Sequence, residues 1–313
     1  MTWITWAELA AAVSNAGGLG VVGPNAGERT VATNAVETGE RLRRQIKKIK
    51  SLTKNPFGVN ILIAESDYPP GGKAYSDQCL KIVLEEGIPV AVLSGGAPET
   101  YTKQLKDAGI KVLHRALPIN VESAKRAEQV GVDALIAVGF EGGGHVGHDC
   151  LPTFVLVPQI VDAVKIPVVA GGGIMNGRGI AAALALGAEG VYLGTRFIAT
   201  TECVAHKNFK EAILNATDTS TATCTGVIGV LRALANPLMK HCIQMETNGS
   251  TPLERAKVYA GGFRKGMIEG DMTDGVLACG AGAGMIKEIK SAAEVVHDIV
   301  EEAEQILSRL QRQ

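Results

Sequence analysis

Seven short apolar runs alternate with helix-compatible segments through the first two hundred residues of this chain. The runs have the length of strands buried on both faces, and the segments between them carry apolar residues at helical spacing. Such alternation requires parallel strands that are joined by right-handed helical crossovers. The predicted strands cover residues 19–23, 56–63, 90–95, 111–117, 134–140, 167–173 and 190–197. The predicted helices cover residues 5–16, 34–50, 76–86, 98–108, 120–130, 153–164 and 177–186, with a Pro- and Gly-rich loop at 64–75.

The fold class that this pattern favours is α/β, as a TIM (β/α)8 barrel. A closed barrel of this kind has eight parallel strands, and the alternation supplies seven. Because the chain opens on a helix, we expect the first strand to be missing or truncated before Met1. An open, doubly wound sheet is the alternative.

Residues 203–275 break the alternation. This stretch is too long for a loop, and we interpret its composition as that of a helical insertion or lid. We therefore predict a barrel domain from residues 1–202 and 276–313 and a helical subdomain from 203–275, with a closing amphipathic helix over 287–313.

Charge and cysteine usage exclude several classes of protein. The formal net charge is -1, which argues against a surface built for nucleic acid or membrane binding. No apolar run reaches the ~18 residues of a membrane-spanning helix, and no signal peptide precedes the first helix, so we expect a cytoplasmic protein. The six cysteines form no CxxC pair, so neither a disulfide framework nor a metal site is indicated. We expect a small-molecule substrate, and the protein partner to consider is a second copy in a homodimer.

The apolar run at 134–140 leads directly into Glu141-Gly-Gly-Gly-His-Val-Gly-His148. Four glycines and two histidines in eight residues predict a segment that is neither strand nor helix. A histidine held by such glycines at the carboxyl end of a strand lies where α/β proteins place their chemistry. We take His145 as the candidate catalytic residue, and His148 as a solvated loop histidine. Cys150 lies nearby, and we interpret it as inert.

Two further glycine loops lie at the carboxyl ends of the last two predicted strands. Gly171-Gly-Gly173 ends the strand predicted over 167–173 and precedes the helix at 177–186, and Gly194-Thr195 lies in the second half of the strand predicted over 190–197. In barrels these two loops commonly hold a phosphate with backbone N–H groups and a helix N-terminus. The pattern therefore predicts a phosphorylated cofactor or substrate, without saying which.

Five motifs together resemble the nitronate monooxygenase (2-nitropropane dioxygenase-like) superfamily of FMN-binding TIM barrels, which also contains flavin-dependent enoyl-acyl-carrier-protein reductases and NAD(P)H:quinone reductases. The motifs are Ala10-Ala-Ala-Val-Ser-Asn-Ala-Gly-Gly-Leu-Gly20, Pro56-Phe-Gly-Val-Asn60, Glu141-Gly-Gly-Gly-His-Val-Gly147, Gly172-Gly-Ile174 and Leu193-Gly-Thr-Arg-Phe197. The resemblance covers nearly the whole chain.

The resemblance implies a role for each matching residue. His145 would be the catalytic histidine above the flavin ring. The FMN-binding residues would be Met1, Asn60, Gly144, Gly172, Gly173, Gly194 and Thr195. Asn60 is also the one polar residue of an apolar strand, so it needs a hydrogen-bonding partner in any case.

The resemblance leaves the reaction open among related flavin enzymes. We expect the reaction to be the oxidation of alkyl nitronates with oxygen. The alternative is the reduction of enoyl thioesters or quinones with NADH or NADPH. Lys48-Ile-Lys-Ser-Leu-Thr53 and Ala205-His206 resemble the enoyl reductase branch, whereas Phe197-Ile-Ala-Thr-Thr-Glu-Cys203 resembles the quinone reductase and monooxygenase branches. A phosphate-binding barrel without flavin, such as an isomerase or a synthase, is the alternative from another class.

Overall fold

The computed structural model describes residues 1–64 and 72–312, which divide into two compact units. The first unit comprises Met1–Ile136 and Ile160–Val168, and the second comprises Ala137–Gln159 and Val169–Gln313. Seven parallel strands follow the order β1-β2-β3-β4-β5-β7-β8. Strands β1 to β4 belong to the first unit and β8 to the second, while β5 (Ala134–Val138) and β7 (Val168–Gly171) each contribute residues to both. The α/β fold with a parallel sheet is therefore confirmed.

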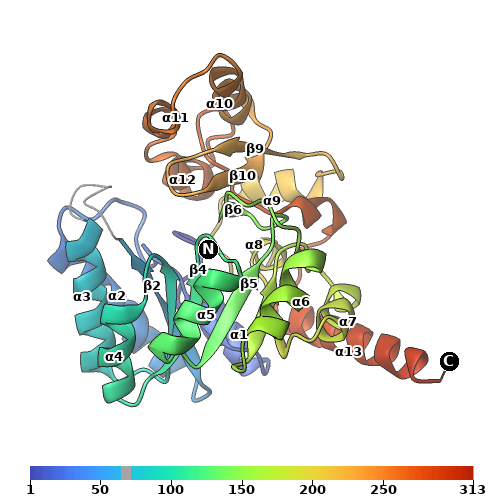
Figure 1. Cartoon of the computed structure of the whole chain (residues 1–313). Coiled ribbons are helices and arrows are strands. Elements are labelled where there is room, and N and C mark those ends of the chain that lie inside the picture. The colour runs from blue at the N-terminus through green and yellow to red at the C-terminus, as the bar shows by residue number, and fades with distance from the viewer. Residues whose placement is uncertain (65–71, 313) are drawn as a thin grey trace. The chain divides into compact units, whose positions relative to one another are not determined.

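The first unit is a run of strand–helix repeats. Its strands are β1 (Gly20–Val22), β2 (Phe57–Ile63), β3 (Val90–Gly95), β4 (Lys111–Ala116) and the start of β5. Its helices are α1 (Ala7–Asn15), α2 (Ala35–Leu52), α3 (Gly72–Glu86), α4 (Glu99–Asp107) and α5 (Val121–Val130), of which α2, α3 and α4 lie beside the strands in Figure 1. Leu42, Ile46 and Ile49 form the buried stripe of α2, at the spacing that one helix face requires.

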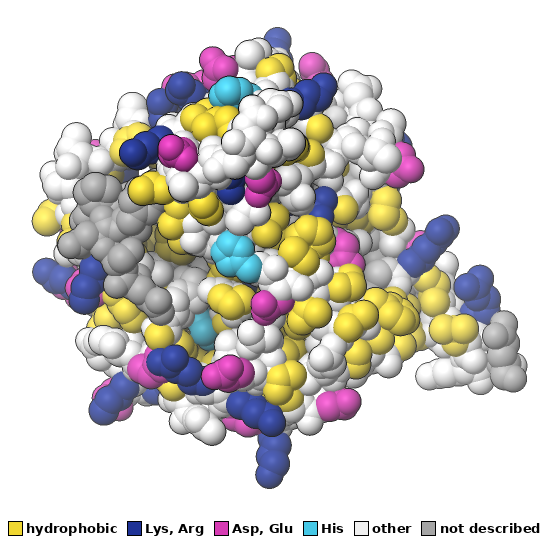
Figure 2. Space-filling view, turned by 45° about the horizontal axis from the view of Figure 1, so that its top comes forward, with side chains coloured by type: hydrophobic (Ala, Val, Ile, Leu, Met, Phe, Trp, Pro, Cys, Tyr) yellow, Lys and Arg dark blue, Asp and Glu magenta, His cyan; other side chains and the backbone are white. Residues whose placement is uncertain are grey.

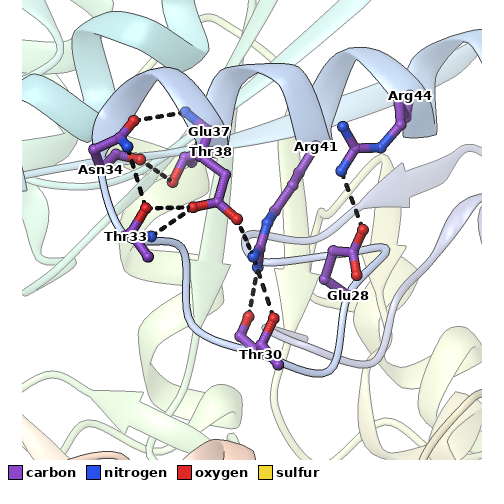
Figure 3. A network of polar contacts seen from close by, with 8 residues as sticks. All are labelled: Glu28, Thr30, Thr33, Asn34, Glu37, Thr38, Arg41 and Arg44. Carbon is purple, nitrogen blue, oxygen red and sulfur yellow. Dashed lines mark hydrogen bonds and ion pairs between the residues drawn. The ribbon is translucent and has the colours of Figure 1, made fainter.

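The loop that follows β1 is fastened to α2 by a polar network (Figure 3). The buried Arg41 guanidinium donates to the backbone carbonyl and the hydroxyl of Thr30 and pairs with Glu37. The Glu37 carboxylate also accepts hydrogen bonds of 2.7 Å from both the backbone N–H and the hydroxyl of Thr33. These bonds hold the pKa of Glu37 at about 2. The network therefore fixes a loop at the carboxyl end of the sheet.

The second unit combines the remaining parallel strands with a small antiparallel sheet. Its further strands are β6 (Gly144–Val146), β8 (Gly190–Tyr192), β9 (Thr221–Thr225) and β10 (Val230–Leu234). Its helices are α6 (Thr153–Ala163, which continues into the first unit), α7 (Gly177–Ala185), α8 (Thr195–Ile198), α9 (Lys207–Leu214), α10 (Pro237–Thr247), α11 (Pro252–Val258), α12 (Gly262–Arg264) and α13 (Ala292–Leu310), with a π-helical turn at Lys265–Glu269 and a 3-10 turn at Ala281–Met285.

The structure corrects several sequence predictions. Residues 203–275 are not only helical, because β9 and β10 pair with each other and β10 pairs with β6; Figure 1 shows α10, α11 and α12 beside these strands. The strand predicted over 190–197 ends at Tyr192, since Gly194 leads into the helical turn α8. Helix α3 begins at Gly72, earlier than predicted, and residues 65–71 of the predicted loop lie outside the described residues.

The surface carries mixed charge. Basic and acidic side chains are interspersed on the face that Figure 2 shows. Within residues 1–64 and 72–312, no helix has both the length and the apolar character needed to cross a membrane.

Candidate functional site

The histidine loop is held in place by close backbone contacts within the second unit. The Gly139 N–H donates to the Gly171 carbonyl over 3.0 Å, which ties the start of the loop to the end of β7. Gly143 lies against the chain at Cys279, and a Cβ added there would be only 2.5 Å from the Cys279 carbonyl carbon. The Ala281 N–H donates to the Glu141 carbonyl over 2.9 Å. The glycines therefore permit a packing that side chains would prevent.

The prediction that this segment is neither strand nor helix is wrong for three of its residues. Gly144, His145 and Val146 form strand β6, which pairs antiparallel with β10 in the register Leu231↔His145. A short glycine-rich strand has no local signature, because its hydrogen-bonding partner lies far along the chain. The small sheet therefore fixes the backbone that carries the histidine.

His145 is half-buried in an aromatic environment. The His145 imidazole and the Phe263 ring lie with their centroids 5.7 Å apart and tilted by 32°. A Cβ added to Gly226 would lie 2.9 Å from the Tyr259 hydroxyl and 4.0 Å from Cδ2 of His145. The His145 ring and the Tyr259 hydroxyl therefore both lie close to Gly226.

Glu141 links the histidine loop to the first glycine loop. Its carboxylate accepts hydrogen bonds of 2.9 Å from the backbone N–H and from the hydroxyl of Thr153, the first residue of α6. A carboxylate is stabilised at a helix N-terminus. The Thr153 hydroxyl also lies 3.0 Å from the Gly172 carbonyl. One carboxylate thus connects the histidine loop, α6 and the end of β7.

The two glycine loops fit a phosphate. Outside the strand ladders, the backbone N–H groups of Gly173 and Gly194 donate to no carbonyl in the described part of the chain. Gly172 has φ +93°, and a Cβ there would lie 2.9 Å from the Gly139 carbonyl oxygen. The Thr195 hydroxyl accepts a 2.8 Å hydrogen bond from the Gly280 N–H, and its own proton is left to donate. Two backbone donors and one hydroxyl donor are groups of the kind that hold an anion without a charged side chain.

Arg232 is a site residue that sequence reasoning missed. It lies on β10 opposite Gly144, and its Nε donates to the Phe140 carbonyl over 3.2 Å. The guanidinium also stacks 4.8 Å from the centroid of the Phe140 ring and donates to the Thr221 hydroxyl over 3.1 Å. Burial lowers the pKa of Arg232. Arg232 therefore clamps the start of the histidine loop onto the small sheet.

The first unit holds the two other predicted site residues. The Asn60 side-chain amide donates to the Val92 carbonyl over 3.1 Å and to the Ser94 hydroxyl over 2.5 Å, so the predicted need for a partner is met on the neighbouring strand. The Met1 carbonyl accepts a 3.1 Å hydrogen bond from the Thr5 hydroxyl. Met1 packs against Gly23, immediately after β1. Asn60 thus belongs to a parallel strand, and Met1 packs against the segment that follows another.

Cysteines and metals do not add to this site. Cys279 lies behind the histidine loop, where burial raises its pKa to about 12, and such a thiol is unreactive. Cys150 is exposed. Among residues 1–64 and 72–312, no cluster of His, Cys, Asp and Glu side chains is placed to hold a metal ion.

The parallel α/β sheet, with the histidine loop and the glycine loops after its strands, is the architecture of an α/β enzyme. The sequence matches the nitronate monooxygenase family over residues 1–302, and the chain belongs to this family of oxidoreductases. The resemblance seen in the five sequence motifs is thereby confirmed.

Three relatives match most of the chain. A FabK structure from Thermotoga maritima superposes with a TM-score of 0.87 at 37% identity, covering 99% of this chain and 93% of that chain. A "probable nitronate monooxygenase" of Staphylococcus aureus is 34% identical, covering 79% of this chain and 76% of the relative. A protein of Rhodococcus jostii named as an octahydro-1H-indene-carboxyl-CoA dehydrogenase is 30% identical, covering 97% of this chain and 90% of the relative.

Proposed function

We propose that the protein is an FMN-dependent oxidoreductase. The N–H groups of Gly172, Gly173 and Gly194 and the hydroxyl of Thr195 would hold the FMN phosphate. The support is that the N–H groups of Gly173 and Gly194 make no turn or loop hydrogen bond to a carbonyl in the described residues, and that the Thr195 hydroxyl accepts a bond from Gly280 and keeps its proton to donate. Asn60, Met1 and Gly144 would contact the rest of the cofactor. The seven parallel strands would then belong to a (β/α)8 barrel with the cofactor at the carboxyl ends of its strands.

When bound, FMN would supply hydride transfer, which protein side chains cannot provide. His145 would hold and move the proton that accompanies the reaction, because an imidazole titrates near neutral pH. Tyr259 and Phe263 would orient this imidazole. Arg232 would keep its loop in place by holding the Phe140 carbonyl.

We propose an acyl thioester as the substrate class, with reduction of an enoyl thioester by NADH or NADPH as the reaction. The observation that carries this proposal is the near-complete match to the FabK structure, since FabK is an enoyl-acyl-carrier-protein reductase. The match to a carboxyl-CoA dehydrogenase over 97% of the chain points to the same kind of substrate. In this reaction His145 would donate the proton that the α-carbon of the substrate gains.

Oxidation of alkyl nitronates is the second candidate, and the sequence motifs alone placed it first. The match to the Staphylococcus aureus relative favours it. Here His145 would assist as the substrate loses electrons, either as a base or through its charge.

The test compares both reactions in one preparation. The purified protein is given crotonyl-CoA with NADH or NADPH, and separately propyl-2-nitronate with oxygen. We expect turnover of the thioester, and turnover of the nitronate alone would overturn the thioester proposal. His145→Ala should lower turnover at least a hundredfold, within the range that general acid catalysis contributes. His148→Ala is the matched control, because His148 is exposed in the same loop and should leave turnover unchanged.

A further inference from the structure

A small cavity opens in the second unit between α13 and the segments that follow β7 and β8. Its volume is about 200 Å³. A cavity of about 150 Å³ can hold a benzene molecule, so this space suits a small organic ligand. None of the residues predicted to bind FMN is among the described residues that line it. The cavity is therefore a different place from the two glycine loops.

The walls of the cavity are held by contacts that involve the backbone. The Gly177 N–H donates to the Glu302 carboxylate over 2.7 Å, which ties the start of α7 to α13 (Figure 1). A Cβ added to Gly177 would lie 2.4 Å from the Ala303 nitrogen, so the two helices lie in close contact there. Along another wall, the Thr201 N–H donates to the Lys290 carbonyl over 3.0 Å. The shape of the cavity is thus set by the packing of the chain itself.

One arginine is buried at this cavity without a carboxylate partner. Arg196 is 8% exposed, and its Nη1 donates to the backbone carbonyls of Ala199 over 3.2 Å and Glu288 over 3.5 Å. Within residues 1–64 and 72–312, it forms no ion pair, and its Nε and Nη2 make no hydrogen bond and stay reachable from solvent. Burial lowers the pKa of Arg196, and the charges of Glu288 and Asp298 act against this shift. A bound anion would supply the partner that a buried guanidinium requires.

The other charged groups around the cavity also favour an anion. Glu288 and Asp298 both pair with Lys290, over 2.7 Å and 2.8 Å. Lys287 donates to a backbone carbonyl over 2.8 Å and, like Arg196, forms no ion pair within the described part of the chain. Every carboxylate in the described lining is therefore engaged, whereas two cations have no carboxylate partner.

We propose that this cavity binds a short aliphatic carboxylate such as butyrate. A guanidinium binds a carboxylate through two parallel hydrogen bonds, and Nε and Nη2 of Arg196 are the two donors that are left for them. The aliphatic chain would lie against Met175, Ile286, Val295 and Ile299, which line the cavity and are each at most 8% exposed. This site is independent of the oxidoreductase reaction proposed above.

Isothermal titration of sodium butyrate into the full-length protein, with and without saturating FMN, tests the site. We expect saturable binding of one butyrate per chain in both titrations. No saturable binding would overturn the proposal, and so would binding that FMN abolishes, because butyrate would then occupy the phosphate site. Butyramide lacks the charge and inorganic phosphate lacks the chain, so each should bind at least about tenfold more weakly. Binding of either compound as tight as that of butyrate would overturn the assigned ligand class.

Three variants locate the bound carboxylate. Arg196→Gln should weaken butyrate binding at least about tenfold, because two charge-assisted hydrogen bonds are lost. Lys287→Gln, at an exposed position that tolerates the change, should weaken it about threefold. Arg178→Gln is the matched control, since Arg178 is exposed on α7 and does not line the cavity, and its butyrate affinity should stay within about twofold of the unaltered protein. Unchanged affinity in Arg196→Gln, or in Lys287→Gln if the first variant does not fold, would overturn the proposal, as would an equal loss in all three variants.

Discussion

Arg232→Met should loosen the histidine loop. The substitution removes two hydrogen bonds, of 3.2 Å to the Phe140 carbonyl and 3.1 Å to the Thr221 hydroxyl, together with the stacking on the Phe140 ring. Hydrogen bonds to charged groups contribute about 1.5–3 kcal/mol each, and a partly exposed cation–π contact about 0.5–1 kcal/mol. Burial of the guanidinium, which lowers the pKa of Arg232, offsets part of this gain. We estimate a net loss of about 2 kcal/mol in the free energy that holds β6 to β10.

Hydrogen–deuterium exchange of the β6 and β10 amides measures this loss directly. A decrease of about 2 kcal/mol in the local opening free energy makes exchange about 30-fold faster. Arg178→Met is the matched control, because Arg178 in the same unit is 79% exposed and makes one 3.7 Å ion pair with Glu302. Such a pair contributes little, so exchange in the control should change less than about twofold. Exchange in Arg232→Met that stays within threefold of the unaltered protein would refute the clamp.

Three further predictions follow from other contacts. Gly172→Val should reduce FMN retention at least tenfold in equilibrium dialysis. The Cβ of the valine would lie 2.9 Å from the Gly139 carbonyl oxygen, and the φ of +93° at this position suits glycine. Unaltered FMN retention would contradict the phosphate site. Thr195→Val should weaken FMN binding about tenfold, because the phosphate loses one hydroxyl donor. The affinity for NADH should stay unchanged. An equal loss of affinity for FMN and for NADH would contradict the assigned role, because it would point to misfolding. Glu37 has a folded pKa of about 2, below the ordinary 4.5, so its contribution to stability is present above pH 4.5 and is lost as the pH falls toward 2. Thermal unfolding can be followed by the fluorescence of Trp3 and Trp6, which lie in the same unit. The unaltered protein should lose more thermal stability over this pH range than Glu37→Gln does. Equal losses in the two proteins would contradict the stabilising role of the network.

The parallel part of the fold is readable from the sequence because its signals are local. Asn120 precedes an apolar-periodic stretch and predicts a helix from that point, and α5 follows it with a capping box between Asn120 and Ser123. The strands predicted at 56–63 and 90–95 appear as β2 and β3 with nearly the same bounds. Family membership was also predictable, since the motifs that carry it are contiguous segments.

The small antiparallel sheet was missed because its stability comes from pairing across the chain. Thr221-Ala-Thr-Cys-Thr225 does alternate with a period of two and is rich in β-branched residues, a signal that the composition-based helical interpretation overlooked. For Gly144–Val146 no such signal exists, and the strand forms because β10 supplies partners to its backbone.

The candidate site was predictable in its backbone parts and not in its arginine. Glycine density marks loops that approach a ligand or another backbone closely, and Gly143 and Gly172 both require it. Arg232 stands in a segment without a recognisable motif. The role of Arg232 depends on the strand register that places it opposite Gly144. The register between strands that lie far apart in the chain cannot be predicted from the local sequence of either strand.

The measurement that tests the central claim most directly is a pair of anaerobic half-reactions, followed by the absorbance of the protein. The FMN-loaded protein is first reduced with NADH or NADPH and then mixed with crotonyl-CoA in the absence of oxygen. We predict that a pyridine nucleotide bleaches the flavin bands and that the thioester restores them, with both steps slowed in His145→Ala. Flavin that only a nitronate bleaches would contradict the thioester assignment, and a colourless protein that takes up no FMN would contradict the flavin site itself.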